Sequence, residues 1–348
     1  MARVGTSLVE VARRCSVSQS TVSRVLNNAK HGRFSVSPEV RARIVKTARE
    51  LNYRPSIAAR NLAVSKTNLV AVLGIQGFWS DRVGPLEEAI NVLAEKLDRE
   101  GYEICVQFMS LRHGAFELPP LRVDGVVAAG PSRPEEVQAL EDADIPYVSL
   151  DGVAGKRGLQ VVPDDAGGTW IAARHLYDLG HRRIAYMDHP SVAVSHPSVL
   201  NRREAFKRAA KKLGFEIPVM HLARLAPDAP WDTYYRPFLQ ESVVEGRATA
   251  VLSYSHYGAL SLLRTAHDMG LNVPADFSLA CFNNEPVLAL AVPSITAVEL
   301  PSVPMGQMAA DLLLREMAGK TSVETRCMKL EEKLIVREST APPAAGRA

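Results

Sequence analysis

Three features are scarce in this sequence: long apolar runs, paired cysteines and the motifs of common enzyme classes. No run of about 18 apolar residues occurs and none opens the chain, so we expect neither a membrane-spanning helix nor export. Nucleophile-elbow, P-loop, HExxH and strand-associated GxGxxG motifs are missing, so we expect neither an enzyme nor a cofactor. Since no cysteine pair has metal-binding or redox spacing, we expect no metal site and four buried thiols of a cytoplasmic protein: Cys15, Cys105, Cys281 and Cys327.

Acidic residues are scarce in the first 66 positions. This segment holds 13 Lys and Arg against 3 Asp and Glu, a net charge of +10, while the rest of the chain holds 28 against 35, a net charge of −7. A basic segment joined to an acidic body is the electrostatic footprint expected for binding a polyanion.

Residues 8–27, LVEVARRCSVSQSTVSRVLN, predict two short amphipathic helices joined by a tight turn. Thr6 or Ser7 can cap the first helix and Ser18 the second. Apolar residues recur at helical spacing on one face of each helix: Leu8, Val11 and Ala12 in the first, and Val22, Val25 and Leu26 in the second.

Polar residues cover the opposite face of the second helix. Such a helix fits a DNA major groove, where glutamine can pair with adenine through two hydrogen bonds. The alternative is an ordinary helical hairpin with a solvated polar face, and the excess positive charge of this segment counts against it. The outward residues are Gln19, Ser20, Thr21, Ser23 and Arg24, of which the last can bond guanine or a phosphate.

A third helix is predicted from Pro38 to Leu51, followed by YRPSIAARNLA at 53–63. Pro55 prevents the third helix from continuing. The residues after it can form two helical turns, which would order only against a partner copy or DNA. Leu62 could then wedge between base steps in the minor groove. A plain linker with an incidental leucine is the alternative.

Residues 6–62, with the motifs VSQSTVSRVLN and YRPSIAARNL, resemble the DNA-binding headpiece of the LacI/GalR family of bacterial transcription regulators. The resemblance implies that Gln19 and Ser20 occupy the principal specificity positions and that Leu62 is the minor-groove leucine of a hinge helix. The loop at 28–35 is several residues longer than is usual in the family. The implied DNA-binding residues are Thr6, Ser18, Gln19, Ser20, Thr21, Ser23, Arg24, Asn27, Tyr53, Ala59 and Leu62.

Predicted strands and helices alternate from residue 68 onward. The run LVAVLGI at 69–75 is apolar throughout, as is typical of a parallel strand buried on both faces. Such repetition predicts parallel sheets in two doubly wound lobes, with a ligand cleft between the carboxyl ends of their strands. Further strands are expected at 102–108, 123–130, 145–151, 249–254 and 277–284, and helices at 85–100, 134–143, 203–215 and 258–271.

Four later segments extend the family resemblance over essentially the whole chain: LGHRRIAYM (179–187), VPADFSLACFNN (273–284), PSITAVELP (293–301) and VRESTAPP (336–343). The implied fold is an all-α helix-turn-helix headpiece followed by an α/β core of two doubly wound parallel-sheet lobes, like a periplasmic binding protein. The chain would cross between the lobes near residues 164, 296 and 328. The expected divisions are a DNA-binding domain (1–53), a hinge helix and linker (54–66), an effector-binding and dimerisation core (67–340, with an N-lobe of 67–163 and 297–327 and a C-lobe of 164–296 and 328–340) and a disordered tail (341–348).

The residues expected at the cleft depart from the family's sugar-binding pattern. Sugar-binding members place an arginine four positions before an aromatic residue, and Arg202 and Phe206 match. Where those members often carry Asn-Asp and Asp-Asp, this chain has Ser255-His256 and Asn283-Asn284. Carboxylates accept strong hydrogen bonds from sugar hydroxyls, so their loss weakens the case for a simple neutral sugar.

Arg202, with His256 and two amides, would suit an acidic or phosphorylated ligand. A decayed effector cleft lined only by polar loop ends is the alternative. The candidate effector-binding residues are Phe78, Trp79, Asp81, Arg202, Phe206, Ser255, His256 and Asn283.

Together these features predict a sequence-specific DNA-binding transcription regulator that acts as a repressor. We expect a homodimer on a palindromic operator in double-stranded DNA, controlled by a sugar, a sugar derivative or an acidic metabolite in the cleft. One alternative is a DNA-binding regulator with a non-functional cleft, or an architectural DNA binder whose core only dimerises. A solute-binding protein is a further alternative, against which the basic headpiece argues.

Overall fold

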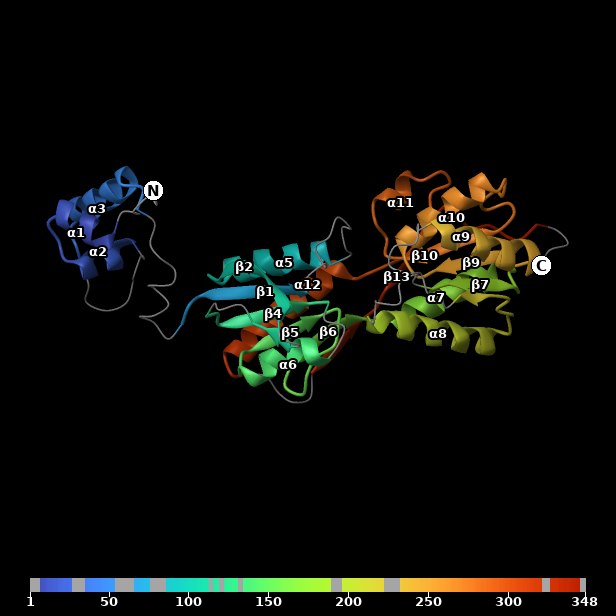
Figure 1. The fold of residues 1–348 in the computed structure, drawn as a ribbon, viewed down its shortest axis with the longest axis horizontal. Helices are drawn as coiled ribbons and strands as arrows, with labels where there is room; N and C mark the ends of the chain where they lie inside the picture. Colours follow the sequence, from blue (N-terminus) through green and yellow to red (C-terminus); the bar gives the residue numbers. More distant parts are fainter. Residues whose placement is uncertain are drawn as a thin grey trace. The chain divides into compact units, whose positions relative to one another are not determined.

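A computed structural model describes the chain in two compact units, Met1–Thr67 and Asn68–Ala348 (Figure 1). We call the first unit the headpiece and the second the core. The described residues are 7–26, 35–53, 66–75, 86–112, 115–118, 122–130, 134–188, 196–221, 232–320 and 326–344.

The headpiece contains the three predicted helices: α1 (Leu8–Arg14), α2 (Gln19–Leu26) and α3 (Pro38–Glu50). Ser7 caps α1, since its side chain accepts a hydrogen bond from the amide of Glu10, and Ser37 caps α3 in the same way. The apolar faces meet in one small core, in which Val11, Val22 and Ile44 are completely buried. This packing orients the opposite, polar face of α2 towards solvent.

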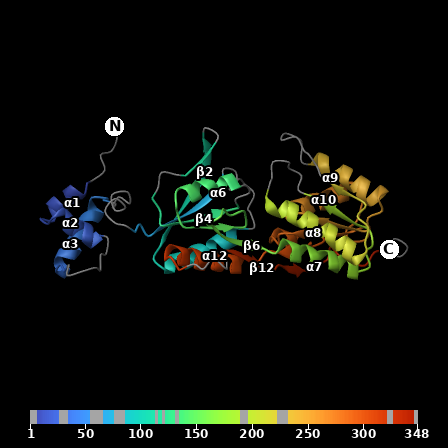
Figure 2. The same cartoon turned by 90° about the horizontal axis from the view of Figure 1, so that it is seen from below.

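The first sheet of the core has the strand order β12-β6-β5-β4-β1-β2-β3. Neighbouring strands are parallel, except that β3 is antiparallel to β2. Helices α5 (Glu87–Arg99) and α12 (Ser302–Met317) cover one face and α6 (Pro134–Asp142) the other (Figure 2). The strands are β1 (Leu69–Ile75), β2 (Glu103–Arg112), β3 (Ala115–Glu117), β4 (Gly125–Ala129), β5 (Tyr147–Leu150), β6 (Leu159–Pro163) and β12 (Cys327–Leu330).

The second sheet has the order β13-β11-β10-β9-β7-β8, and only β13 runs antiparallel to its neighbour. Helices α7 (Asp165–Asp178) and α8 (Pro197–Leu213) cover one face. The other face is covered by α9 (Asp232–Leu239), a π-helix (Gln240–Glu245), α10 (His256–Asp268) and α11 (Val287–Leu290). The strands are β7 (Ile184–Met187), β8 (Met220–His221), β9 (Ala250–Ser253), β10 (Ser278–Phe282), β11 (Thr296–Glu299) and β13 (Lys333–Ile335).

Strand β1 shows why an unbroken apolar run forms a central strand. Val70 and Val72 pack towards α5 and α12, while Ala71 and Leu73 pack towards α6. Successive side chains of a strand point to opposite faces, and a sheet covered by helices on both faces therefore needs apolar residues at every position. The α/β core with parallel sheets, predicted from this pattern, is confirmed.

The chain passes between the two sheets three times. The first passage follows β6, at residue 164. The second lies at 300–301 instead of near 296, because Thr296–Glu299 is a strand paired with β10 in the second sheet. The third lies at 331–332 instead of near 328, because Cys327–Leu330 is paired with β6 in the first sheet. The expected boundaries at 296 and 328 therefore fell inside strands: β11, which lies between β13 and β10, and the edge strand β12, whose partner β6 is distant in sequence.

The C-terminal segment is ordered further than the sequence predicts. A disordered tail was expected from residue 341, but 341–344 belong to the described residues. The amide of Ala341 donates to the hydroxyl of Ser278 at 3.0 Å, and the carbonyl of Ala341 accepts from that hydroxyl at 2.9 Å. These bonds attach the segment to the start of β10.

The cysteines are not uniformly buried, contrary to expectation. Cys15 and Cys281 are buried, Cys105 is half-buried and Cys327 is exposed, because it lies on the edge strand β12.

Among the described helices, none has the length and apolar character required to cross a membrane.

Candidate DNA-binding surface and ligand cleft

The start of α2 is held by its cap. The hydroxyl of Ser18 accepts a hydrogen bond from the amide of Thr21 at 3.1 Å, which satisfies one of the free amides of the first turn. Ser16 supplies the turn before it with a positive φ of 51°. The cap and the turn therefore fix the backbone of the first turn of α2, from which its side chains project.

The predicted base-reading face of α2 is accessible. Gln19, Ser20 and Arg24 are exposed, and Thr21 and Ser23 are half-buried. The hydroxyl of Ser20 lies 2.8 Å from that of Ser18, so it is hydrogen-bonded to the residue that caps the helix. Gln19 is exposed at the first position of α2, and its side-chain amide suits contact with a base edge.

An ion-pair group on α1 was not anticipated from the sequence. Glu10 accepts hydrogen bonds from Arg13 at 2.7 Å and from Arg14 at 3.1 Å. These bonds lower the pKa of Glu10 to about 2. The spacings i,i+3 and i,i+4 were a visible signal for the contact. Two of the cations counted in the basic segment are therefore paired within the headpiece.

Several predicted site residues lie outside the described residues: Thr6, Asn27, Ala59 and Leu62 of the DNA-binding set, and Phe78, Trp79 and Asp81 of the effector set. Tyr53, the last described member of the DNA-binding set, is half-buried against the headpiece core.

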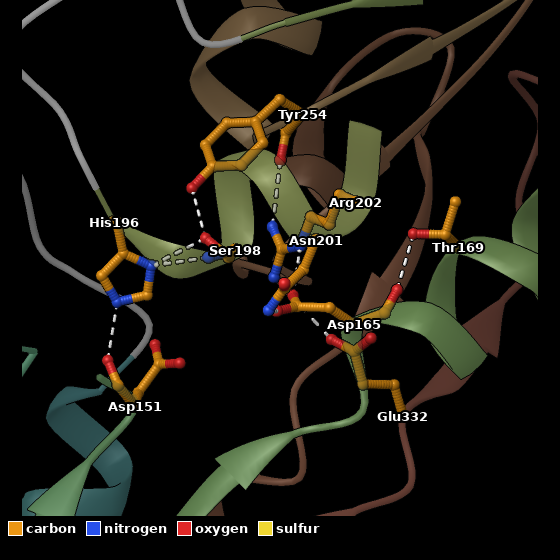
Figure 3. Close-up of polar contacts among 9 residues, drawn as sticks. All are labelled: Asp151, Asp165, Thr169, His196, Ser198, Asn201, Arg202, Tyr254 and Glu332. Carbon is orange, nitrogen blue, oxygen red and sulfur yellow. Dashed lines mark hydrogen bonds and ion pairs between the residues drawn. The ribbon is translucent and has the colours of Figure 1, made fainter. Parts of the chain in front are cut away.

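Arg202, on α8, is held entirely by contacts within the core (Figure 3). It is 3% exposed. Its Nε donates to Asp165 at 2.7 Å and its Nη1 to the backbone carbonyl of Tyr254 at 3.2 Å. The guanidinium carbon lies 4.2 Å from the ring centre of Phe282, a cation–π contact. The side chain expected to face an anionic ligand is thus already neutralised by the protein.

The second carboxyl group near Arg202 is Glu332, at the third passage between the sheets. Its Oε1 lies 3.9 Å from Nη2 of Arg202, and its side chain is 0% exposed. Burial, opposed by Arg202, raises the pKa of Glu332 to about 8. Arg202 therefore joins Asp165, at the first passage, to Glu332, at the third.

A second polar chain links the end of β5 to the start of α8 (Figure 3). Nε2 of His196 lies 2.6 Å from the carbonyl of Asp151. Nδ1 of the same ring accepts from the amide of Ser198 and so caps α8, which requires Nε2 to carry the proton and donate. The hydroxyl of Ser198 lies 2.6 Å from that of Tyr254. His196 therefore connects the two lobes by a direct hydrogen bond.

The sequence did not indicate Asp151, Asp165, His196 and Glu332 as site residues, because they are far apart in the chain and only the fold brings them together. The paired acids at 164–165, at the expected lobe crossing near residue 164, were the one available signal.

The other candidate effector residues have mixed positions. Phe206 is completely buried and packs between Tyr186 and Phe215, so it is a core residue rather than a lining residue. Ser255 caps α10, and its hydroxyl accepts from the amide of Gly258. The next residue, His256, is buried, and burial lowers its pKa to about 4.

Known proteins match both units. Residues 7–56 match the bacterial regulatory proteins of the lacI family, and residues 173–340 match the periplasmic binding protein-like domain. The HTH-type transcriptional repressor PurR of Escherichia coli is 28% identical over 344 residues, covering 96% of this chain and 97% of that protein. Catabolite control protein A of Priestia megaterium is 27% identical and covers 96% and 99%. The chain belongs to the LacI family.

A solved structure supports the same fold for this LacI-family protein. The lac repressor dimer, bound to operator and an anti-inducer, superposes with a TM-score of 0.76 at 23% identity, covering 97% of this chain and 99% of that one. A headpiece with a helix-turn-helix and a two-sheet core are therefore both established. The chain is a DNA-binding transcription regulator of the repressor type.

Two pockets of the LacI-family core are lined by described residues. One, of about 450 Å³, is lined by Asp151, Asp165, His196, Asn201 and Lys329, among others. The other, of about 340 Å³, brings α5 next to the segment after β10. Its described lining has four carboxylates and no Lys or Arg, and it contains the predicted effector residue Asn283: Glu87, Glu88, Asn91, Asn283, Asn284, Glu285, Pro286, Glu299, Leu300 and Ser302.

Proposed function

We propose that this LacI-family regulator represses transcription as a homodimer on a roughly palindromic operator, under the control of a small molecule bound between the core lobes. The observation that carries the proposal is the capped start of α2, on which Gln19 and Ser20 are exposed. We propose, from the family resemblance, that these two residues read the operator sequence. Two copies would place two such helices in successive major grooves. We assign the protein no catalytic step and no cofactor, and we place its action in the cytoplasm.

A second copy would also cover an apolar surface of the core. Leu290 is 80% exposed and Val292 is 90% exposed, the first at the end of the short helix α11 and the second just after it. Exposed apolar side chains grouped in this way mark a surface for protein contact. Leu290→Asp should lower the dimer fraction in analytical ultracentrifugation, whereas the same change at Leu200, another exposed leucine, should leave it unchanged.

The effector is proposed to be neutral or cationic. The sequence suggested an acidic ligand because of Arg202, but this side chain is already paired with Asp165 and buried beside Glu332. The pocket that contains Asn283 has only acidic charges among its described lining residues. Burial, together with Glu87 and Glu88, raises the pKa of Glu285, as expected where carboxylates crowd each other.

Thermal-shift titrations compare three probes: a linear diamine, a neutral pentose and a dicarboxylate. Stabilisation by the first or the second supports the proposal. Stabilisation by the dicarboxylate alone would reject it.

A regulator with a non-functional cleft is the second candidate, favoured by the internal pairing of Arg202. One experiment separates the two. Duplexes are selected from random DNA by the purified protein, and the selection is repeated with a pooled metabolite extract. An enriched palindrome that the extract weakens or strengthens supports the effector-controlled repressor. A palindrome indifferent to the extract supports the second candidate, and no enrichment rejects both.

A further inference from the structure

Glu332 is a carboxyl group buried at the point where the chain passes from one lobe to the other. Strand β12 ends at Leu330 in the first sheet and β13 begins at Lys333 in the second. The Glu332 side chain is 0% exposed, and within the described part of the chain neither of its oxygens has a hydrogen-bond partner. A buried carboxylate without hydrogen bonds is costly, so this position favours the neutral acid.

The charges that face Glu332 come from three other segments. Arg202, on α8, lies 3.9 Å away and donates its best hydrogen bond to Asp165 instead. Asp164 and Asp165, at the first passage, and Asp151, after β5, add negative charge. One guanidinium therefore faces several acids, and a proton on Glu332 relieves the excess negative charge.

The backbone of α7 fixes the place of Glu332. A Cβ atom built on Gly168 would lie 1.7 Å from Oε2 of Glu332. Only glycine leaves room for the carboxyl group here, so the side chain lies directly against the first turn of α7. The absence of a side chain at residue 168 therefore accommodates the buried Glu332 carboxyl group.

We propose that Glu332 is a proton-controlled positioning residue of the lobe connection: it is protonated while buried between Arg202 and Gly168, and it ionises when movement of the third passage admits water. Lobe movement and proton release are then the same event. The link to DNA rests on the proposed function, in which lobe movement controls operator binding.

The direction of the pH effect follows from the two protonation states. An exposed Glu332 would titrate near the ordinary pKa of 4.5, and the buried group has a pKa of about 8. Between these values the buried arrangement holds one more proton. Its advantage over the exposed arrangement is complete below the lower value and is lost as the pH rises towards the higher one. Each pH unit in this window changes the equilibrium by up to about tenfold.

The first test requires no DNA. Thermal unfolding midpoints of the wild type, Glu332→Gln and Glu331→Gln are measured from pH 5 to pH 9. Glutamine at position 332 has the shape and charge of the protonated acid, and Glu331 is the exposed neighbour, so its substitution is the matched control. We expect the wild type to lose stability relative to Glu332→Gln up to about pH 8, and Glu331→Gln to follow the wild type. Parallel profiles for wild type and Glu332→Gln would overturn the proposal.

An infrared measurement on a protein that retains Glu332 covers the case in which Glu332→Gln does not fold. Glutamate carboxyls are labelled with ¹³C in a Glu285→Gln background, because burial also raises the pKa of Glu285. We expect a protonated-carboxyl band at pH 6 that disappears by pH 9. Absence of this band at pH 6 would also overturn the proposal.

The coupling to DNA is tested with a duplex selected by the wild type. The ratio of the affinities of wild type and Glu332→Gln should change by at least about threefold between pH 6 and pH 8.5, while Glu331→Gln keeps a constant ratio to the wild type. A constant ratio for Glu332→Gln would remove the link to DNA. If the wild type binds no duplex, the proposed function fails, while the unfolding profiles still decide the protonation of Glu332.

Discussion

Arg202 Nε donates to Asp165 Oδ1 at 2.7 Å, although the two residues are 37 positions apart in the sequence. Both side chains are almost completely buried, at 4% and 8% exposure. The pair lies where the chain first passes between the sheets, and it is completed by Glu332 from the third passage. The arginine that was expected to bind a ligand therefore connects separate segments of the core.

Replacing Arg202 by Gln should destabilise the core by about 3–5 kcal/mol, because Asp165 would lose its buried counter-ion. The matched control is Arg174→Gln, which breaks a pair of the same type with Asp178 at 2.7 Å, exposed on α7. That change should cost less than about 1 kcal/mol. Urea unfolding of both variants measures the difference, and equal costs would contradict the structural role of Arg202.

Replacing Gln19 by Ala should change which sequences are bound. Gln19 is exposed at the start of α2, and loss of its paired hydrogen bonds to a base should cost about 1–3 kcal/mol at one base pair of each half-site. Affinities for a set of singly substituted operators measure this. An equal loss on every duplex, including non-operator DNA, would show that Gln19 does not read a base.

Replacing Glu10 by Gln should strengthen binding to DNA of any sequence. The change releases Arg13 and Arg14 from their hydrogen bonds with Glu10, so both cations become available for phosphates. The logarithm of affinity should also fall more steeply with salt in the variant. Glu50→Gln is the control, since Glu50 pairs with Lys46 on α3. Identical salt slopes for Glu10→Gln and the wild type would refute this effect.

Replacing Leu62 by Ala should reduce DNA bending and operator affinity while the fold stays intact. The reason is the proposed wedge between base steps in the minor groove, since Leu62 itself lies outside the described residues. Gel mobility of circularly permuted operator fragments measures the bend. Leu200→Ala, an exposed leucine of the core, should leave the bend unchanged. An unaltered bend with Leu62→Ala would exclude the wedge.

The helices of the headpiece could be predicted from the sequence because their causes are local. A serine cap, an apolar stripe and a proline at the first turn act within a few residues, so Ser7, Ser18 and Pro38 indicate helix starts directly. The strand at 69–75 was equally clear, since burial on both faces demands an unbroken apolar run. Net charge and motif spacing then indicated the class of function.

Only the tertiary structure decided the state of the cleft. The sequence by itself showed Arg202 four positions before Phe206, as in sugar-binding members. It did not show that Arg202 would be paired with Asp165 and buried beside Glu332, or that Phe206 would belong to the core. The same applies to the lobe boundaries, which depend on the pairing of β11 with β10 and of β12 with the distant strand β6. Ion pairs and strand pairing join residues from separate segments, and the free energy of a buried charge depends on which groups the fold brings within a few ångströms of it.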